Sequence, residues 1–494
     1  MEEMLTGLLN VMSFSNLFFI AVGMTLGIFI GSMPGLSATM GIAILLPLTY
    51  GMDPATGIAM LAALYMGASY GGSITAVLIN TPGTPAAAAT VLDGYPMSQN
   101  GEAGKALGIS LVSSFIGGVA GAIVLLTIAP FLGEVALKIG VVELFAIAVL
   151  GITIISSLST GSVIKGLLSG TLGLLISLIG MDAITGTPRF TFGSIYLFDG
   201  ISFVVALIGL FSIPQALKLI ERDTQEIKVS KINDKILPSW KEIFRLRYTL
   251  LRSSVIGVIV GLIPGTGGDT ASWFSYNEAK RFSKEKEKFG TGHAEGVAAP
   301  ESANNAVVGG ALVPTITLGV PGSSSTAVLL GGLMIHGIMP GPTLMTEHAD
   351  VAYTLLWAVL ISCFFMLGLG ILYTRVAVGV TKVPPKVLAP IIILLCVIGT
   401  FAVHNSMVDV MIMFGFGIAG YFMDKLKIPV APMVVGLILG IMLDTTMNQS
   451  LKIGRGDWMI FLSKPVAAIL LFIALITILQ STPLFGKLKS LIKR

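Results

Sequence analysis

Charge is what this sequence lacks most. Only 11% of its 494 residues are Asp, Glu, Lys or Arg, while 54% are hydrophobic, whereas an average soluble domain carries roughly 25% charged residues. A soluble protein of this composition could not cover its surface with polar groups, so lipid must solvate much of the chain. The net charge of +4 is small and unclustered, and we therefore expect no nucleic-acid partner.

Cysteine and the common catalytic motifs are scarce as well. Cys363 and Cys396 both lie inside apolar runs, so neither a disulfide framework nor a cysteine metal site is expected. The sequence contains no Walker loop, dinucleotide fingerprint, zinc-protease signature or nucleophile elbow. The remaining candidates for chemistry are scattered histidines without metal-ligand spacing and acids that stand alone near segment ends: His293, His336, His348, His404, Asp182, Asp409 and Asp444. We expect no enzyme, no ATP-driven pump, no resident metal and no cofactor.

Long apolar runs are abundant instead. Examples are Leu111–Leu132, Gly200–Ile220, Val351–Tyr373 and Pro465–Leu479. Because about 20 apolar residues span the hydrocarbon core as a helix, and the alternation of barrel strands is missing, we expect an all-α polytopic membrane protein with about eleven or twelve hydrophobic segments. The first segment, Leu17–Met33, follows no basic region and is expected to stay in the protein.

Glycine and proline, 59 and 23 residues, gather in two stretches that look alike. Each stretch contains Gly-x-x-Pro-Gly, then Gly-Gly, then Pro-Gly-Thr or Pro-Gly-Ser. If Gly72 is paired with Gly310, Pro82 lies ten residues after Gly72 and Pro321 lies eleven residues after Gly310. The pattern indicates an internal duplication. The stretches are Gly31–Gly41 with Tyr70–Pro96, and Gly261–Ser272 with Val308–Gly332.

Basic residues are distributed unevenly around the two repeats. None precedes Lys105, whereas a basic loop and a charged insert, Asn277–Glu295, accompany the second repeat. Cytoplasmic loops collect Lys and Arg, so corresponding loops are expected on opposite membrane faces, as in an inverted-topology repeat. A direct repeat with an accidental charge bias remains the alternative. The basic residues are Arg222, Lys228, Lys231, Lys235, Lys241, Arg245 and Arg247 in the loop, and Lys280, Arg281, Lys284, Lys286 and Lys288 in the insert.

The two repeats and the basic segments divide the chain into four parts. The predicted parts are a first repeat half with following spans (1–220), a cytoplasmic connector (221–252), a second repeat half (253–432), and C-terminal spans with a basic cytoplasmic tail, Lys487–Arg494 (433–494). The segment Ser253–Phe274 has Pro264 and several glycines near its centre. A broken or re-entrant helix is therefore expected there rather than a straight span.

The Pro-Gly pairs are the strongest candidates for a binding site. In lipid, non-helical backbone is tolerated only where protein or a water-filled cavity shields it. The N–H groups freed at the start of the next half-helix favour an anion, and the carbonyls of the preceding half can coordinate a cation. A kink filled by packing is the alternative. The predicted substrate-binding residues are Asn80, Thr81, Pro82, Gly83, Thr84, Pro321, Gly322, Ser323 and Ser324, with sodium near Asn80, Thr84, Gly319 and Ser323.

Secondary candidates surround these pairs. They could form outer parts of the same cavity or simply pack: Gly35, Ser37, Gly265, Thr266, Asp269, Asn304 and Asn305. Glu301 opens the apolar stretch before Gly309, and an ionisable group near membrane depth is a functional candidate. A helix-start carboxylate favoured by the dipole is the plainer interpretation of Glu301.

Several of these motifs together resemble one known family, the large membrane subunit of the tripartite tricarboxylate transporters. The resemblance covers roughly Val22 to Pro432, including order and spacing. It is carried by GSMPGL (Gly31–Leu36), YGGSIT (Tyr70–Thr75), NTPGTP (Asn80–Pro85), LDGYP (Leu92–Pro96), GLIPG (Gly261–Gly265) and GVPGS (Gly319–Ser323). The resemblance implies a bacterial inner-membrane importer of small organic anions such as citrate and other di- and tricarboxylates. It also implies coupling to a sodium or proton gradient, and partnership with a small membrane subunit and a periplasmic solute-binding protein.

These expectations combine into a mechanism in which the two broken-helix sets meet near the midplane and hold a carboxylate between opposed half-helix starts, with a cation beside it. One module would then move against a scaffold, as in an elevator. A stand-alone carboxylate carrier without partners is the nearest alternative. A membrane-embedded enzyme would need a nucleophile or general base with a partner at membrane depth, which the scattered acids and histidines do not offer.

Overall fold

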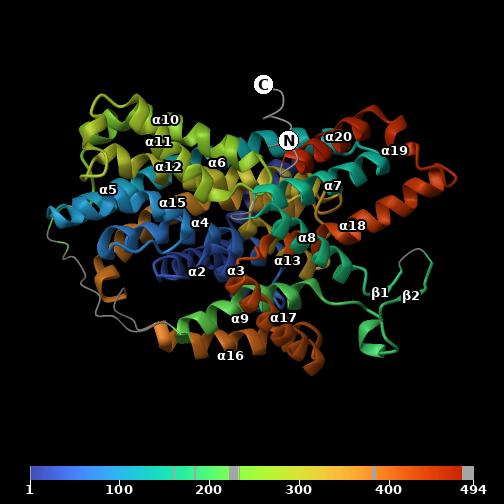
Figure 1. Ribbon diagram of the computed structural model, residues 1–494. Helices are drawn as coiled ribbons and strands as arrows, with labels where there is room; N and C mark the ends of the chain where they lie inside the picture. Colours follow the sequence, from blue (N-terminus) through green and yellow to red (C-terminus); the bar gives the residue numbers. More distant parts are fainter. Residues whose placement is uncertain are drawn as a thin grey trace, which may run out of the picture. The chain divides into compact units, whose positions relative to one another are not determined.

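The computed structural model describes residues 2–158, 162–182, 185–221, 232, 234–380 and 385–480. Within these ranges the chain forms 20 α-helices and one two-stranded hairpin, β1 (Gly180–Met181) with β2 (Pro188–Arg189) (Figure 1). Seven of the described helices are long and apolar enough to cross a membrane, and six shorter apolar helices accompany them. The predicted all-α polytopic membrane fold is confirmed.

The chain groups into two compact units. Unit 1 comprises Met1–Gly133 and Gln215–Val403, and unit 2 comprises Glu134–Pro214 and His404–Arg494. Both Gly/Pro stretches belong to unit 1. The two units are defined by contacts in space, whereas the four predicted parts are consecutive segments of the sequence. The units therefore do not test the four parts, which stay a prediction. Of the basic segments predicted to be cytoplasmic, Arg222, Lys228, Lys231 and the tail Lys487–Arg494 lie outside the described residues.

Unit 1 begins with α1 and builds the same order of elements twice. In each repeat a long helix is followed by a break and a second helix, then by another long helix, a second break and a final helix. The first repeat consists of α2 (Phe14–Gly31), α3 (Ala38–Leu45), η1 (Leu46–Thr49), α4 (Pro54–Ile79), η2 (Pro85–Ala87) and α5 (Ala88–Gln99). The second consists of α10 (Trp240–Leu262), α11 (Gly267–Phe282), η4 (Lys286–Lys288), α12 (Ala294–Leu318) and α13 (Ser324–Ile335). The other elements are α1 (Glu2–Val11), α6 (Ala103–Ala136), α14 (Leu344–Glu347), α15 (Ala349–Val380) and α16 (Pro385–His404).

The long helices α4 and α12 end in the same way. Asn80 and Gly319 follow their last residues in the left-handed conformation, with φ of 57° and 71°. The backbone N–H of Asn80 donates to the Thr75 carbonyl, and that of Gly319 donates to the Pro314 carbonyl. Such caps satisfy carbonyls that a helix end would leave without a partner. The predicted interruptions before Pro82 and Pro321 are therefore helix ends with matched geometry.

The first helix of each repeat packs on the third through glycine. A methyl group at Gly27 of α2 would overlap the Leu64 carbonyl of α4, and one at Gly257 of α10 would overlap the Ala303 carbonyl of α12. Glycine lets helix backbones approach closely in a membrane. The pairs α2–α4 and α10–α12 therefore pack at equivalent positions.

A second matched contact corrects the register of the repeat. A methyl group at Gly71 would lie 2.5 Å from a carbonyl oxygen of α2, and one at Gly310 would lie 2.6 Å from the corresponding oxygen of α10. The residue equivalent to Gly310 is therefore Gly71, and pairing it with Gly72 was wrong. With this register, eleven residues separate the glycine from Pro82 and from Pro321 alike.

Unit 2 contains three of the six shorter apolar helices, two of the long candidate spans and the hairpin. Helix α18 packs against both α7 and α8. Its contact with α8 is close at Gly173, where a methyl group would overlap the Met433 carbonyl. The members of unit 2 are α7 (Val141–Leu158), α8 (Val163–Ser177), β1, β2, η3 (Ile195–Leu197), most of α9 (Phe203–Glu221), α17 (Met407–Lys425), α18 (Ala431–Ile453), α19 (Ile460–Ser463) and α20 (Pro465–Gln480).

Two acids that looked solitary in the sequence share one cation in unit 2. Arg189 on β2 pairs with Asp182, and its Nη1 donates to both carboxylate oxygens of Asp444 at 3.0 and 2.9 Å. The third acid, Asp409, lies 2.7 Å from Nδ1 of His404 at the junction of α16 and α17. Asp182 and Asp444 are therefore ion-paired with Arg189 and Asp409 has a histidine partner, so the expectation that these acids stand alone was wrong.

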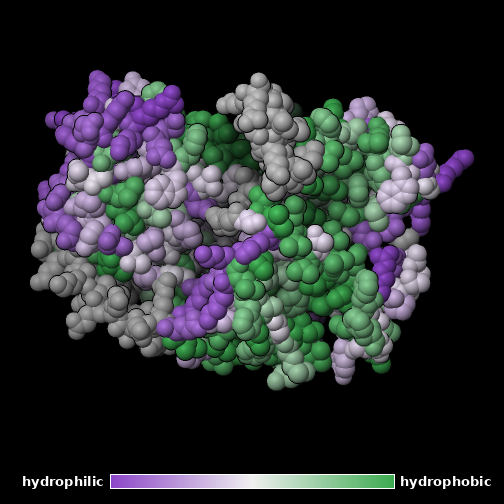
Figure 2. Space-filling view, in the orientation of Figure 1, coloured by the Kyte–Doolittle hydropathy of each residue, from purple (hydrophilic) through white to green (hydrophobic). Residues whose placement is uncertain are grey.

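The surface of unit 1 carries a strongly hydrophilic region. Figure 2 shows hydrophilic residues gathered over α5, α10 and α11, where the charged insert lies. Its exposed charged side chains are Lys280, Arg281, Lys284, Glu285, Lys286, Glu287 and Lys288. Elsewhere in unit 1 large apolar side chains are exposed, for example Phe131, Phe364 and Leu372. An exposed apolar surface of this kind suits contact with lipid acyl chains.

Candidate functional site

The two breaks of each repeat lie against each other. In the first repeat the N–H of Gly83 donates to the Gly72 carbonyl at 3.0 Å, and a methyl group at Gly83 would overlap the Gly31 carbonyl. In the second repeat the N–H of Gly265 donates to the Gly322 carbonyl at 2.9 Å. The folded chain thus brings each early Pro-Gly segment to the late Pro-Gly segment of its own repeat.

The helix starts after the breaks also pair across the repeats. The Thr39 hydroxyl in the first turn of α3 lies 2.9 Å from the Ser325 hydroxyl at the start of α13. In the reciprocal pair, a methyl group at Gly268 in the first turn of α11 would lie 3.4 Å from Cβ of Ala86 in η2. A methyl group at Gly267 would also lie 4.0 Å from Cβ of Ser323, so the starts of α3, α11 and α13 and the short 3₁₀ helix η2 meet in unit 1, two from each repeat. Their combined N-terminal dipoles favour negative charge at this place.

Helices α4 and α12 contribute one polar side chain each to this meeting point. The Tyr65 hydroxyl lies 3.2 Å from the Ser323 hydroxyl, and the Asn304 amide donates to the Ser69 carbonyl at 2.9 Å. A methyl group at Gly268 would overlap Oδ1 of Asn304, so this amide faces the start of α11. Tyr65 and Asn304 both lie fifteen residues before the left-handed cap of their helix.

Sequence reasoning missed Tyr65. A tyrosine inside an apolar run suggests core packing, and its neighbours on either side are leucine and methionine. The available signal was positional, because Tyr65 occupies in the first repeat the position that Asn304 occupies in the second. Aligning the repeats by their helix caps would have found it.

Ser323 and Thr84 occupy equivalent positions but have different hydrogen bonds. Ser323 caps α13: its hydroxyl accepts from the Thr326 N–H at 3.2 Å, and its own N–H donates to the Thr326 hydroxyl at 2.9 Å. Thr84 precedes η2 in an extended conformation, and its side chain makes no capping bond. The Thr84 hydroxyl is buried, and within the described structure it has no hydrogen-bond partner. A buried hydroxyl without a partner is costly, which makes Thr84 a candidate for contact with a ligand; its oxygen faces Gly72 of α4, where an added methyl group would overlap it.

The other predicted binding residues divide by exposure. Asn80 and Thr81 are exposed, Pro82 and Ser324 are half-buried, and Gly83, Pro321 and Gly322 are buried. Asn80 acts through its backbone as the cap of α4. The buried members of both sets are those that lie where the breaks meet.

The secondary candidates lie at the first break of each repeat or on α12. Each has a visible local role. The Gly35 carbonyl accepts from the Gln215 amide, Ser37 caps α3, and the Thr266 hydroxyl donates to the Val260 and Ile263 carbonyls. Gly265 contacts Gly322, Asp269 stands half-buried in the first turn of α11, and Asn305 donates to the Glu301 carbonyl.

The meeting point has no arginine or lysine clamp. In the part of the chain that is described, the hydrogen bonds of Thr39, Tyr65, Asn304, Ser323 and Ser325 involve hydroxyls, amides and backbone groups alone. A carboxylate here would be held by N–H dipoles and hydroxyls. Helix ends contribute about 0.3–1 kcal/mol each for a charge near the first turn, so a bound cation would add substantially to the affinity for a multiply charged anion.

The histidines lie at helix ends, apart from this place. His293 precedes α12, His336 and His348 follow α13 and α14, and His404 ends α16. Burial lowers the pKa of His336, although the charge of Asp53 opposes that shift. No group of three His, Cys, Asp or Glu residues among those described could hold a metal ion.

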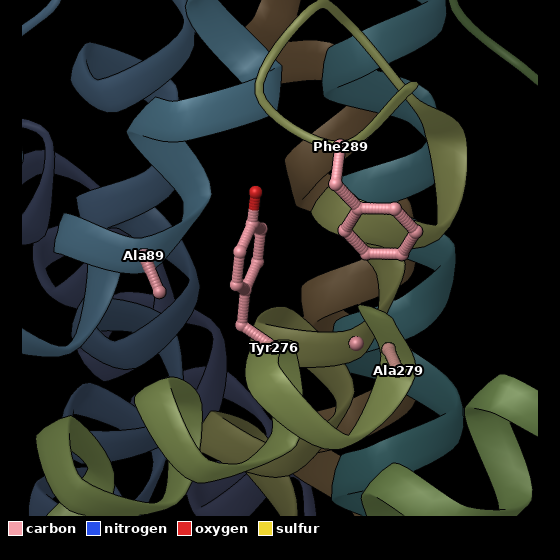
Figure 3. Close-up of a cluster of buried hydrophobic side chains, with 5 residues drawn as sticks. Ala89, Tyr276, Ala279 and Phe289 are labelled. Carbon is pink, nitrogen blue, oxygen red and sulfur yellow. The ribbon is translucent and has the colours of Figure 1, made fainter. Parts of the chain in front are cut away.

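Asp93, in the LDGYP segment of α5, fastens the charged insert of the other repeat. Its Oδ1 accepts the N–H groups of Gly290, Gly292 and His293 at 2.9, 3.0 and 2.7 Å, and its Oδ2 accepts the Tyr276 hydroxyl at 2.8 Å. Figure 3 shows the Tyr276 ring standing between α5 and the insert. The sequence identified the LDGYP motif, but no role was predicted for its aspartate.

Comparison with known proteins agrees with this architecture. The sequence profile of the family described as "Tripartite tricarboxylate transporter TctA family" matches residues 17–435. The chain belongs to this family. TctA proteins are the large membrane subunits of tricarboxylate transporters that include other subunits, and the chain is accordingly a transport protein of the membrane.

Two relatives in Agrobacterium vitis are similar to the chain. One is named "Uncharacterized 52.8 kDa protein in TAR-I ttuC' 3'region"; it is 36% identical over 461 residues, which are 93% of this chain and 92% of the relative. The other, "Uncharacterized protein in TAR-II ttuC' 3'region", is 32% identical over 223 residues, which are 45% of this chain and 92% of the relative. No solved structure matches the chain.

Proposed function

We propose that this TctA-family chain forms the pathway by which a small organic anion, of the di- or tricarboxylate class, is imported across the bacterial inner membrane. A sodium or proton gradient drives the import. The single observation that carries the proposal is the meeting of the starts of α3, α11, α13 and η2 after two matched pairs of breaks, with the buried hydroxyl of Thr84, which has no partner in the described structure, directly before η2.

The lack of a cationic clamp at this place supports coupling to a cation. N–H dipoles and hydroxyls alone provide weak compensation for two or three carboxylate charges. A sodium ion or proton that enters with the anion reduces the net charge carried through the bilayer, and the helix-end carbonyls and hydroxyls are hard oxygen ligands of the kind such a cation prefers.

The reciprocal contacts of the repeats support an inverted-topology arrangement. The start of α3 faces the start of α13, and the start of α11 faces η2, so exchanging the two repeats exchanges these contacts. Two repeats related in this way place equivalent breaks symmetrically about the midplane. Movement of one module against a scaffold, as in an elevator, would expose the site to each side in turn.

Family membership supports dependence on two partners, a small membrane subunit and a periplasmic solute-binding protein. The binding protein would deliver the anion and set the inward direction of transport, while this chain supplies the route. Genes for a four-span membrane protein and a secreted binding protein beside the gene for this chain would agree with that assembly.

The test is uptake of radiolabelled citrate, a shorter dicarboxylate and an aromatic carboxylate into vesicles that contain all three subunits. We expect uptake of at least one of them to require the binding protein and an inward gradient of sodium or protons. Uptake by the large subunit alone would favour a stand-alone carrier. Uptake at equal rates with and without any cation gradient would contradict the proposed coupling.

A further inference from the structure

Glu301 is a buried acid that the anion site does not use. It lies in the third turn of α12, which begins at Ala294, and only 1% of the residue is exposed. The interpretation of Glu301 as a helix-start carboxylate was therefore wrong. A carboxylate so far from solvent needs a specific reason to be there.

Hydroxyl groups from two neighbouring helices hold both carboxylate oxygens. The Thr90 hydroxyl of α5 donates to Oε1 at 2.5 Å, and the Ser114 hydroxyl of α6 donates to Oε2 at 3.1 Å. Behind them the hydroxyls of Ser73 and Ser110 lie 2.6 Å apart. All four hydroxyl-bearing residues are fully buried, so the carboxylate sits in a closed group of hard oxygen atoms.

No positive charge balances Glu301 among the residues that are described. The ionisable groups on the helices packed around it interact elsewhere. On α5, Asp93 binds the backbone of the charged insert, and on α11, Tyr276 donates to Asp93. On α6, Lys105 pairs with Glu102 and Glu242, and on α10, Arg252 donates to the Glu278 carbonyl. On α4, Tyr70 interacts electrostatically with Glu301 but supplies no positive charge.

An ionised carboxylate in such a place is strongly disfavoured, because desolvation costs several kcal/mol and no cation compensates it. Two hydroxyl donors offset part of that cost. The remaining charge is neutralised either by a proton on the carboxylate or by a small cation held between the carboxylate and the hydroxyl oxygens. A second polar atom here, Oδ1 of Asn305 one turn along α12, is also buried without a partner within the described residues.

We propose that Glu301, with the hydroxyls of Thr90 and Ser114, binds the monovalent cation whose gradient drives transport. The proposal rests on the proposed function, since it assigns the coupling cation to a residue. The position is suitable, because Asn304 lies three residues further along α12, on a neighbouring face, and contacts the anion site. Thr90 stands on α5, directly after the first repeat's second break, so occupancy by the cation links α12 to that break.

The test compares Glu301→Gln with wild type in the complete three-subunit complex. Glutamine keeps the size and most hydrogen bonds of the side chain but can neither ionise nor bind a proton in this range. The matched control is Glu295→Gln, in the first turn of the same helix. Thermal unfolding of the detergent-purified complex is measured in sodium chloride against choline chloride at constant pH, and then in choline chloride at two pH values.

We expect wild type and Glu295→Gln to be stabilised by sodium, or by acidification if the cation is a proton, and Glu301→Gln to respond to neither. In vesicles, the cation gradient should stimulate wild-type uptake by about 5- to 150-fold, the range of common coupling between two sites, and should not stimulate Glu301→Gln. Thr90→Val and Ser114→Ala keep the carboxylate and should bind sodium more weakly, which provides a measurement if Glu301→Gln does not fold.

The outcomes distinguish a failure of the Glu301 assignment from a failure of the proposed transport function. If gradient-driven uptake and sodium stabilisation survive in Glu301→Gln, the assignment to Glu301 is overturned while ion-driven transport stands. If wild type itself shows no gradient-driven uptake, the proposed function fails. Reduced stability of Glu301→Gln, Thr90→Val and Ser114→Ala with an unchanged response to sodium and to pH would show that the cluster only joins helices.

Discussion

The contrast between Thr84 and Ser323 yields a prediction that separates binding from folding. The two residues are equivalent in the repeats, yet Ser323 caps α13 and contacts Tyr65, whereas the Thr84 hydroxyl has no partner in the described structure. Replacing each hydroxyl by an apolar group should therefore affect stability very differently, although both changes should impair transport.

The expected magnitudes follow from the hydrogen bonds. Ser323→Ala removes a helix cap, which costs about 0.5–2 kcal/mol, and the bond to Tyr65, which contributes about 0.5–1.5 kcal/mol. We therefore expect a loss of about 1–3.5 kcal/mol of stability. Thr84→Val keeps the shape of the side chain and replaces a partnerless buried hydroxyl by a methyl group. That change should be neutral or stabilising by about 1 kcal/mol.

Both variants are purified with their partner subunits, and their thermal unfolding and initial uptake rates are compared with wild type. Thr127→Val is the control, because the Thr127 hydroxyl is exposed and bonds only to carbonyls of its own helix. We expect Thr84→Val to unfold at or above the wild-type temperature and yet to lose most uptake. A Thr84→Val protein as unstable as Ser323→Ala, or one that transports at the wild-type rate, would refute the reasoning.

Two further predictions concern packing. Gly83→Ala and Gly322→Ala each place a methyl group against backbone at a break and should destabilise the protein by about 1–3 kcal/mol. The control Gly368→Ala, with open space around it in α15, should be neutral or stabilising by up to about 1 kcal/mol. Equal melting temperatures for all three variants would contradict the close contact between breaks. Asp93→Asn weakens three backbone hydrogen bonds to the insert and should speed tryptic cleavage at Lys288, and an unchanged cleavage rate would show that the carboxylate does not hold the insert.

The overall architecture was predictable because it depends on gross properties of the sequence. Scarcity of charge and long apolar runs dictate lipid-embedded helices. The ends of α4 and α12 were predictable for a local reason, since proline removes a donor and the preceding residues accept the left-handed conformation. Asn80 shows the limit of that reasoning: the end of α4 was predicted, whereas the left-handed cap formed by the Asn80 backbone is seen only in the structure, and substrate binding by Asn80 stays a prediction.

The side-chain environment of the site could not be derived in the same way. Tyr65, Glu301 and Asp93 depend on which helices lie side by side, and that information is in pairs of glycines far apart in the sequence. Sequence spacing put Gly72 opposite Gly310, whereas contacts of Gly71 with α2 set the true register. An offset of one residue on a helix turns a side chain by about 100°, so the polar partners of α4 and α12 required the folded structure.

A density map of the three-subunit complex with its transported carboxylate bound would test directly where the anion binds. We predict that a carboxylate group of the anion lies within hydrogen-bond distance of the Thr84 hydroxyl and the backbone at the start of α13. An anion bound elsewhere, with Thr84 and Ser323 sealed by packed side chains in the loaded complex, would contradict it.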